Sequence, residues 1–170
     1  ITTTGFVIAD YTKWPMFSQM IIIALMFVGA CSGSTGGGMK VSRIVIYLKN
    51  AKKELKHLLH PHSIQTVEFE KNSIDDHVIV NIHAYLALYL AIFAVSLLIL
   101  TFFCLDFESA FSAVATCLNN VGPGLGVVGP VNNFSSLSDI SKFVLSFDML
   151  AGRLEIFPIL LLFAPSQWRK

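Results

Sequence analysis

The chain has 170 residues, of which 54% are hydrophobic and only 14% are charged. Soluble globular domains carry about 25% charged residues, and a protein this apolar would expose large hydrophobic patches to water. The composition therefore excludes an ordinary soluble domain, and the formal net charge of +1 gives no indication of nucleic-acid binding. We interpret the chain as an integral membrane protein that contacts the lipid bilayer and binds no nucleic acid.

Three apolar segments predict membrane-spanning helices, each of which needs about 20 residues to cross a bilayer. They extend from about residue 14 to 30, from 78 to 105 and from 143 to 164. The first two contain no Asp, Glu, Lys or Arg, whereas the third contains Asp148, Arg153 and Glu155. Tyr11 and Trp14 precede the first span, where an interfacial aromatic belt is expected.

Basic residues gather between the first two spans and at the end of the chain. Those between the first two spans are Lys40, Arg43, Lys49, Lys52, Lys53, Lys56 and Lys71. By the positive-inside rule these segments are cytoplasmic. Residues 1–13 and 106–142 are therefore expected outside, and the C-terminus inside.

Two cytoplasmic elements are expected between the first and second spans. Apolar residues recur at helical spacing from Lys40 to Leu59, which predicts a basic helix that ends before Pro61. Residues 64–75 alternate loosely between apolar and polar and predict a small hairpin. The cysteines, which lie in apolar or small-residue settings, are expected to be buried free thiols. They are Cys31, Cys104 and Cys117.

A different kind of segment follows the second span. Residues 109–118 allow a helix of about 15 Å, which can enter a bilayer but not cross it. A glycine-containing strip from Asn119 to Gly124 comes next. Non-helical backbone survives at membrane depth only where it lines protein or water, and a helix C-terminus carries partial negative charge.

This pattern predicts a re-entrant helix followed by a cation site lined by carbonyl oxygens. Gly122 would let the carbonyls turn toward an axis without an intervening side chain. The alternative is an outer loop rich in turn residues. Residues 2–6 occupy the equivalent place before the first span. The chain therefore predicts an all-α membrane fold of helix–re-entrant pore loop–helix units, with the end of one unit followed by a complete one.

The glycine run from Gly33 to Gly38 follows the first span and separates it from the basic stretch. Its ends stand at the spacing of a phosphate-binding loop, but Met39 stands where that loop needs Lys, Lys40 comes one residue late, and Val41 follows it instead of Ser or Thr. Each glycine also disfavours a helix by about 1 kcal/mol relative to Ala. We expect a flexible break beneath the filter that obstructs conduction, with a plain interfacial loop as the alternative.

Arg153 lies within the third span, and an intramembrane arginine is a functional hypothesis by default. We expect its guanidinium to face the pore cavity and to contact the glycine run, where it would hold the run shut or repel cations. An ordinary ion pair between helices is the alternative.

These segments resemble the membrane subunits of the Trk potassium-uptake family (TrkH/TrkG-like, within the Trk/Ktr/HKT superfamily). The matching sequences are Thr-Thr-Gly-Phe at 3–6, Gly-Ala-Cys-Ser-Gly-Ser-Thr-Gly-Gly-Gly-Met-Lys-Val at 29–41, His-Pro at 60–61, Ala-Phe-Ser-Ala-Val-Ala-Thr-Cys-Leu-Asn-Asn-Val-Gly-Pro-Gly at 110–124 and Gly-Arg-Leu-Glu-Ile at 152–156. They cover the whole chain in the order of the family.

The resemblance implies four linked repeats around one potassium pathway, of which this chain is a C-terminal fragment. Residues 1–59 would hold the third-repeat filter strip and the broken second helix with its glycine-rich intramembrane loop. Residues 60–77 would be a cytoplasmic connector, and residues 78–170 the whole fourth repeat. With fewer than two of four repeats, the chain alone is not expected to form a closed pore.

The family also implies roles for individual residues. The implied filter residues are Thr3, Thr4 and Gly5 in one strip and Asn120, Val121 and Gly122 in the other. Potassium itself would be bound at Thr3, Thr4, Val121 and Gly122. The implied gate consists of Gly33, Ser34, Thr35, Gly36, Gly37 and Gly38, with Arg153 as its pore-side partner.

The implied function is potassium uptake across the bacterial inner membrane, passive or as a weakly coupled symport, with potassium as substrate and no cofactor. The implied partners are the rest of the parent transporter chain, a second copy in a homodimer and a cytoplasmic nucleotide-binding regulatory ring. A Ktr-like sodium-dependent subunit and a non-conducting membrane assembly subunit are alternatives. An enzyme is not expected, because the sequence offers neither a nucleophile–base pair nor metal-ligand spacing.

Overall fold

The computed structural model describes residues 3–31, 33–34, 36–60, 68–69, 72–103, 106–154 and 158. The described α-helices are α1 Met16–Phe27, α2 Val41–Leu59, α3 Asp76–Phe102, α4 Phe107–Leu118 and α5 Asp139–Leu154. The short elements are the 3₁₀ turns η1 Tyr11–Lys13, η2 Gly126–Val128 and η3 Phe134–Ser136, and the strands β1 Glu68–Phe69 and β2 Asn72–Ser73.

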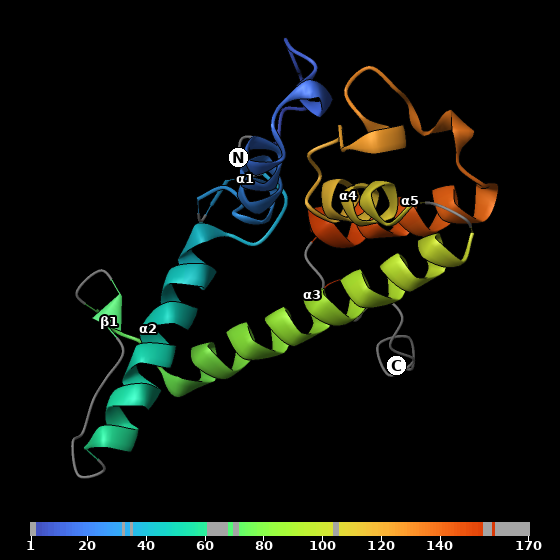
Figure 1. Ribbon diagram of the computed structural model, residues 1–170. Coiled ribbons are helices and arrows are strands. Elements are labelled where there is room, and N and C mark those ends of the chain that lie inside the picture. Colours follow the sequence, from blue (N-terminus) through green and yellow to red (C-terminus); the bar gives the residue numbers. More distant parts are fainter. Residues whose placement is uncertain are drawn as a thin grey trace, which may run out of the picture.

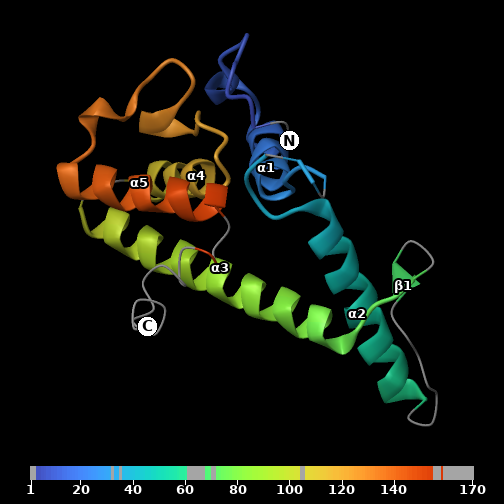
Figure 2. The same cartoon turned by 180° about the vertical axis from the view of Figure 1, so that it is seen from behind.

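The long helix α3 supports the rest of the molecule. One half of α3 lies along α4 and α5, and its N-terminal half lies against α2 (Figures 1 and 2). At the α2 contact, the guanidinium of Arg43 lies over the ring of Tyr85, 4.1 Å from its centroid. The helix α1 stands beside α4, so the two predicted units meet at α4.

The first predicted span is shorter than expected. We expected a helix from about residue 14 to 30, but α1 has only 12 residues, about 18 Å of helix. It begins after Pro15, which fits a helix start because proline lacks a backbone N–H. It ends at Phe27, and chain reversal through the glycine run then leads into α2. The predicted break at the glycines and the predicted basic helix are both found.

The second predicted span is confirmed as α3. Among the described residues, His77–Phe102 is the one stretch of helix long and apolar enough to cross a bilayer, with a mean hydropathy of 2.4 in its most apolar window. The helix α5 begins at Asp139, four residues earlier than predicted, because Ser138 supplies its N-terminal hydrogen bonds. The third predicted span continues beyond Leu154 into residues that, apart from Pro158, lie outside the described part of the chain.

The predicted hairpin is also found, and its cytoplasmic location stays a prediction. Glu68 pairs with Ser73, and Phe69 with Asn72, in antiparallel register. The expectation for the cysteines is correct for Cys117, which is buried, and wrong for Cys31, which is exposed. Cys104 lies outside the described residues.

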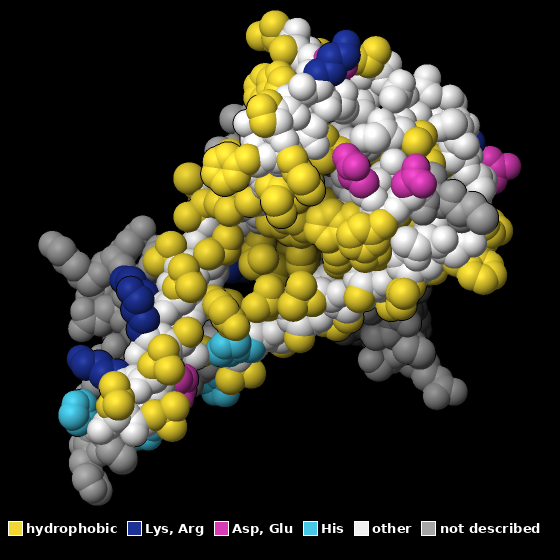
Figure 3. Space-filling view, viewed as in Figure 1, with side chains coloured by type: hydrophobic (Ala, Val, Ile, Leu, Met, Phe, Trp, Pro, Cys, Tyr) yellow, Lys and Arg dark blue, Asp and Glu magenta, His cyan; other side chains and the backbone are white. Residues whose placement is uncertain are grey.

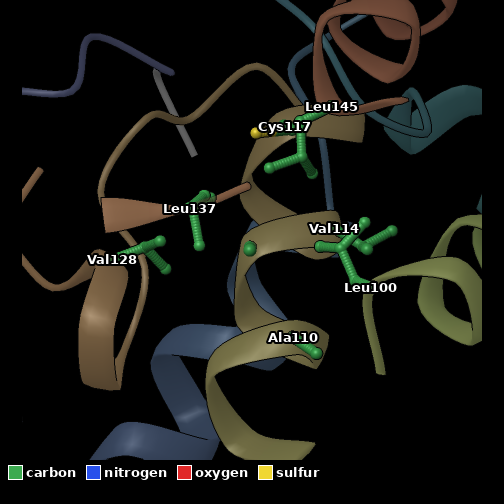
Figure 4. Packing of buried hydrophobic residues seen from close by; sticks show 8 residues of the cluster. Leu100, Ala110, Val114, Cys117, Val128, Leu137 and Leu145 are labelled. Atoms are coloured by element: carbon green, nitrogen blue, oxygen red, sulfur yellow. The ribbon is translucent and has the colours of Figure 1, made fainter. Parts of the chain in front are cut away.

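The core is built around α4, whose residues from Ser109 to Leu118 are buried except Phe111. Small side chains such as Ala110 and Ala113 let α3 and α5 approach this helix closely. Leu100 from α3, Val128 from η2 and Leu145 from α5 complete the main cluster around Val114 and Cys117 (Figure 4). A short helix that could not be stable alone is therefore held on several sides.

Much of the outer surface remains apolar. Hydrophobic side chains cover the region where α1, α2 and α3 meet, and basic side chains lie farther along α2 and at the top of the view (Figure 3). On α1, Met16, Phe17 and Met20 are exposed. Such contiguous apolar surface marks contact with lipid or with further protein.

Candidate functional site

The C-terminus of α4 closes in a compact cap. The N–H of Val121 donates to the carbonyl of Thr116 (2.9 Å), and the N–H of Asn120 donates to the carbonyl of Cys117 (3.1 Å). Asn120 adopts a left-handed conformation with a φ of 55°. This combination is a Schellman motif, in which asparagine takes the place usually occupied by glycine. The cap satisfies carbonyls of the last helical turn and directs the chain into the strip that follows.

The two predicted filter strips share a backbone pattern. The φ angle is positive at Thr3 (52°) and Gly5 (77°) in one strip, and at Asn120 (55°) and Gly122 (104°) in the other. The middle residue of each strip, Thr4 in the first and Val121 in the second, has no positive φ. In a regular strand φ is negative throughout and successive carbonyls point to opposite sides. In both strips the sign of φ alternates over three successive residues, so neither strip is a regular strand.

The two strips lie beside one another although more than a hundred residues separate them. A Cβ built on Gly5 would lie 2.9 Å from the carbonyl oxygen of Val121. Between them lies a cavity of about 350 Å³, lined by Thr3, Thr4, Gly5, Phe6, Val7, Tyr11, Ile22, Leu25, Met26, Val121 and Pro123. None of these lining residues carries a charged side chain, so the polar groups offered to a ligand are hydroxyl and backbone oxygens.

Hydrogen bonds hold the outer end of the second strip in place. The hydroxyl of Ser112 on α4 accepts from the N–H of Leu125 (3.0 Å) and lies 3.1 Å from its carbonyl, to which it can donate. From the other unit, the hydroxyl of Tyr11 donates to the carbonyl of Gly124 (2.9 Å). Burial, with a smaller contribution from the Asp10 charge, raises the pKa of Tyr11. The hydroxyl therefore keeps its proton and remains a donor near neutral pH.

Tyr11 was predicted as part of an interfacial aromatic belt, and its place in the structure is different. Its side chain is buried, whereas that of Trp14 is partly exposed. A tyrosine at a water–membrane boundary and a tyrosine that bonds a distant carbonyl have the same local sequence. Only the contact with Gly124 distinguishes the two.

The glycine run lies directly against the bases of the strips. A Cβ on Gly37 would lie 2.6 Å from the carbonyl oxygen of Asn119, and one on Gly36 would lie 3.5 Å from Oγ1 of Thr3. A Cβ on Gly38, whose φ is +80°, would lie 2.9 Å from Oδ1 of Asn119. A side chain at Gly37 or Gly38 would collide with Asn119, so these two positions need glycine for the close approach, whereas the distance from Gly36 to Thr3 is an ordinary van der Waals contact.

The ends of this run are joined. The N–H of Gly29 donates to the carbonyl of Met39 (2.9 Å), and Val28 and Met39 form an isolated parallel bridge. At Gly29 itself, a Cβ would lie 2.8 Å from the carbonyl of Gly37. The run from Ala30 to Gly38 is thus a loop closed at its ends, and its returning residues Gly36, Gly37 and Gly38 lie against the strips. Thr35, a predicted gate residue, lies outside the described residues, as does Ser32.

Asn119 is a site residue that sequence reasoning did not assign. It is fully buried, its Nδ2 donates to the carbonyl of Ala115 (2.7 Å), and its Oδ1 accepts from the hydroxyl of Tyr89 (2.9 Å). It therefore joins α3, the end of α4 and the glycine loop. The doubled asparagine in the sequence was the available signal, but only Asn120 was assigned a role.

Arg153 occupies the last described turn of α5, and its side chain is exposed. The described residues include no hydrogen bond or ion pair of Arg153 with the glycine loop, so the predicted contact stays a prediction. Its neighbour Gly152 does reach the strip. A Cβ there would lie 1.9 Å from the carbonyl oxygen of Leu118, and the Nδ2 of Asn120 donates to the carbonyl of Met149 (3.2 Å).

Comparisons with known proteins agree with this arrangement. The family described as TrkH, cation transport protein, matches residues 1–170. The Trk system potassium uptake protein TrkH of Escherichia coli K12 is 38% identical over 169 residues, which cover 99% of this chain and 35% of that protein. TrkH of Vibrio parahaemolyticus is 41% identical over 168 residues, covering 99% and 34%. TrkG of Escherichia coli K12 is 34% identical over 169 residues, covering 99% and 34%.

A solved structure has the same fold. The crystal structure of the potassium transporter TrkH from Vibrio parahaemolyticus superposes with a TM-score of 0.87 at 40% identity, covering 99% of this chain and 36% of that chain. The chain thus spans about a third of the length of the relatives it matches. On its sequence, its helical fold and these relatives, the chain belongs to the TrkH family of cation transport proteins.

Proposed function

We propose that this chain contributes two carbonyl-lined filter strips to a potassium-uptake pore in the bacterial inner membrane. The strips are Thr3, Thr4 and Gly5, and Asn120, Val121 and Gly122. The matched relatives named above are Trk system potassium uptake proteins, which supports potassium as the substrate. The other filter strips come from the rest of the parent transporter chain.

The observation that carries this proposal is the pair of strips with the same alternation of φ, placed side by side around an uncharged cavity. A potassium filter works by replacing the water around the ion with backbone carbonyls. Thr3, Thr4, Val121 and Gly122 supply oxygens of that kind on this pathway. The chemistry needs neither a cofactor nor a catalytic residue, which agrees with transporter relatives rather than enzymes.

We assign residues 1–59 to the end of a third repeat, residues 60–77 to a cytoplasmic connector and residues 78–170 to a fourth repeat. The Schellman cap of α4 and the long helix α3 support the fourth assignment. The C-terminus is then cytoplasmic. The basic face of α2 offers a surface to the cytoplasmic nucleotide-binding ring, and the parent protein forms a homodimer.

The glycine loop acts as the gate in this proposal. Its close approach to Asn119 and Thr3 supports a position against both strips, where the loop obstructs a dehydrated ion. The loop moves away from the strips when the pathway opens. Its gate residues are Gly33, Ser34, Thr35, Gly36, Gly37 and Gly38. Arg153 follows Gly152 at the base of the second strip and projects into the cavity of the complete pore, where it repels cations or holds the loop.

The test uses the full-length parent transporter in cells that lack other potassium uptake. We expect it to restore growth on low potassium and to take up potassium in preference to sodium. A sodium requirement for uptake would instead favour the Ktr-like alternative. Failure to restore growth or uptake, with the protein present in the membrane, would contradict the transport function and favour a non-conducting assembly subunit.

The Gly122→Ala variant tests the filter itself. Nothing lies within 4 Å of an added Cβ at Gly122, but its φ of +104° is strained for an L residue. Such strain is of the order of 1–3 kcal/mol and displaces the carbonyls of the strip, so we expect about a five- to hundredfold loss of potassium-over-sodium discrimination. Gly33→Ala is the matched control, because Gly33 also has a positive φ (+84°) and open surroundings. The potassium-over-sodium uptake ratio of Gly33→Ala should equal that of the parent. If Gly122→Ala and Gly33→Ala have the same ratio, Gly122 is not a filter residue.

A further inference from the structure

A buried carboxyl lies beside α4, outside the cavity between the two strips. Asp148 on α5 is fully buried. It shares one face of α5 with Ser141, Leu145 and Ala151, at the three- and four-residue spacing of a core-facing stripe. Leu145 belongs to one apolar cluster and Ala151 to another. The carboxyl thus occupies a position between two apolar clusters, where a hydrophobic side chain would be expected.

The surroundings of this carboxyl do not suit a negative charge. Its Oδ1 accepts one hydrogen bond, from the hydroxyl of Ser96 on α3 (2.8 Å), and its Oδ2 is buried without a hydrogen-bond partner. The titratable groups that interact with it are Tyr89 on α3 and Cys117 on α4, and neither supplies a positive charge. No described Lys, Arg or His contributes an attractive charge at Asp148.

Arg153, on the same helix, is not such a partner. Five residues separate it from Asp148, about 140° around the helix, and its side chain is exposed. An ionised carboxylate buried without a cation or a full set of donors is unfavourable, and the group takes up a proton instead.

The same turn of α5 supports the filter. Met149, next to Asp148, offers its carbonyl to Nδ2 of Asn120, and Gly152, one turn later, packs on the carbonyl of Leu118. On α3, Ser96 and Tyr89 lie on the stretch that also bonds Asn119. A charge at Asp148 would draw water or shift α5 against α3, and the base of the second strip would move with it.

We propose that Asp148 is a proton-binding site behind the filter, and that it positions α5 for conduction only while it is protonated. The inference rests on the proposed transport function. It assigns Asp148 a positioning role, since the carboxyl does not touch the ion pathway. Deprotonation at alkaline pH should lower potassium uptake reversibly.

The test compares the pH profile of potassium uptake by the full-length parent with that of Asp148→Asn. The amide has the shape of the neutral acid and can still accept from Ser96, so uptake near neutral pH should be kept and the alkaline decline should disappear. Ser96→Ala should shift the decline to higher pH, because Ser96 donates to the charged form and its loss favours the neutral one. Ser146→Ala, an exposed serine on α5 that bonds the carbonyl of Lys142, should leave the profile unchanged.

Identical profiles in the parent and Asp148→Asn, or abolished uptake in Asp148→Asn at a normal protein level, would overturn the proposal. The infrared carbonyl stretch of a protonated carboxylic acid supplies an independent readout in the purified parent. That band should weaken at alkaline pH in the parent and be missing from Asp148→Asn. Absence of any such band in the parent would also overturn the proposal, whether or not the parent transports potassium.

Discussion

Tyr11 joins two segments that stand 113 residues apart. Its hydroxyl bonds the carbonyl of Gly124, and its ring lines the cavity between the strips. A single side chain from one unit therefore fixes the outer end of the strip of the other. Asn119 does the same at the inner end, where it connects α3, α4 and the glycine loop. At the scale of single residues, the proposed filter depends on bonds between units rather than on its own backbone alone.

Tyr11→Phe removes this bond and leaves the ring in place. A neutral hydrogen bond contributes about 1 kcal/mol, so we expect about a fivefold loss of potassium-over-sodium discrimination with little change in protein level. The raised pKa of Tyr11 keeps the hydroxyl protonated, so the difference between parent and variant should not depend on pH near neutrality. Tracer uptake of both ions measures it, with Tyr47→Phe on α2 as the control. An unchanged ratio in Tyr11→Phe would show that Tyr11 does not hold the filter.

At the scale of elements, the break between α1 and α2 is the feature that sets this unit apart from α3. Both segments are apolar enough for a membrane, but α3 continues for 27 residues and α1 ends after 12. The loop that follows α1 is closed at its ends by Gly29 and Met39 and contacts the strips through Gly36, Gly37 and Gly38. Its glycines are needed because backbone meets backbone there.

Deletion of Gly36 and Gly37 should raise potassium flux several-fold, because it removes the loop residues that lie against Asn119 and Thr3 while the bond between Gly29 and Met39 keeps the ends of the loop together. Flux in proteoliposomes that contain the full-length parent, at equal protein, measures the effect. Deletion of Val131 and Asn132 in the outer loop is the control of equal length and should leave the flux unchanged. Unchanged or lower flux after the glycine deletion would argue against a gate at this loop.

At the scale of the whole molecule, the chain presents an unfinished surface. The cavity between the strips is bordered by residues of two units, and apolar side chains of α1 such as Phe17 and Met20 are exposed. The chain spans about a third of its relatives. A fourfold pathway needs strips on every side of the ion, and two strips leave it open to lipid or water.

Residues 1–170 reconstituted alone should therefore give no selective potassium flux, whereas the full-length parent in parallel vesicles should. The measurable ratio of the potassium flux of the parent to that of the isolated chain is limited by the background leak of the vesicles. A potassium-selective flux from the isolated chain that matches the parent would show that two strips suffice without further repeats, and would contradict the fourfold proposal.

The sequence by itself determined the elements and their order. The apolar runs, the basic stretch, the glycine run and the short helix before Asn119 were all predicted, because hydropathy, charge and glycine content act locally along the chain. The exact ends of α1 and α5 were less well predicted, since Pro15 and Ser138 set them through backbone geometry and capping bonds.

Only the tertiary structure decided which segments meet. The pairing of Gly5 with Val121, the bond from Tyr11 to Gly124 and the contact of Gly37 with Asn119 join residues that are distant in sequence. The burial of Asp148 could not be predicted either, because a carboxylate in an apolar run has the same sequence whether it faces water or a neighbouring helix. Close packing between helices selects these contacts, and local sequence patterns carry no record of it.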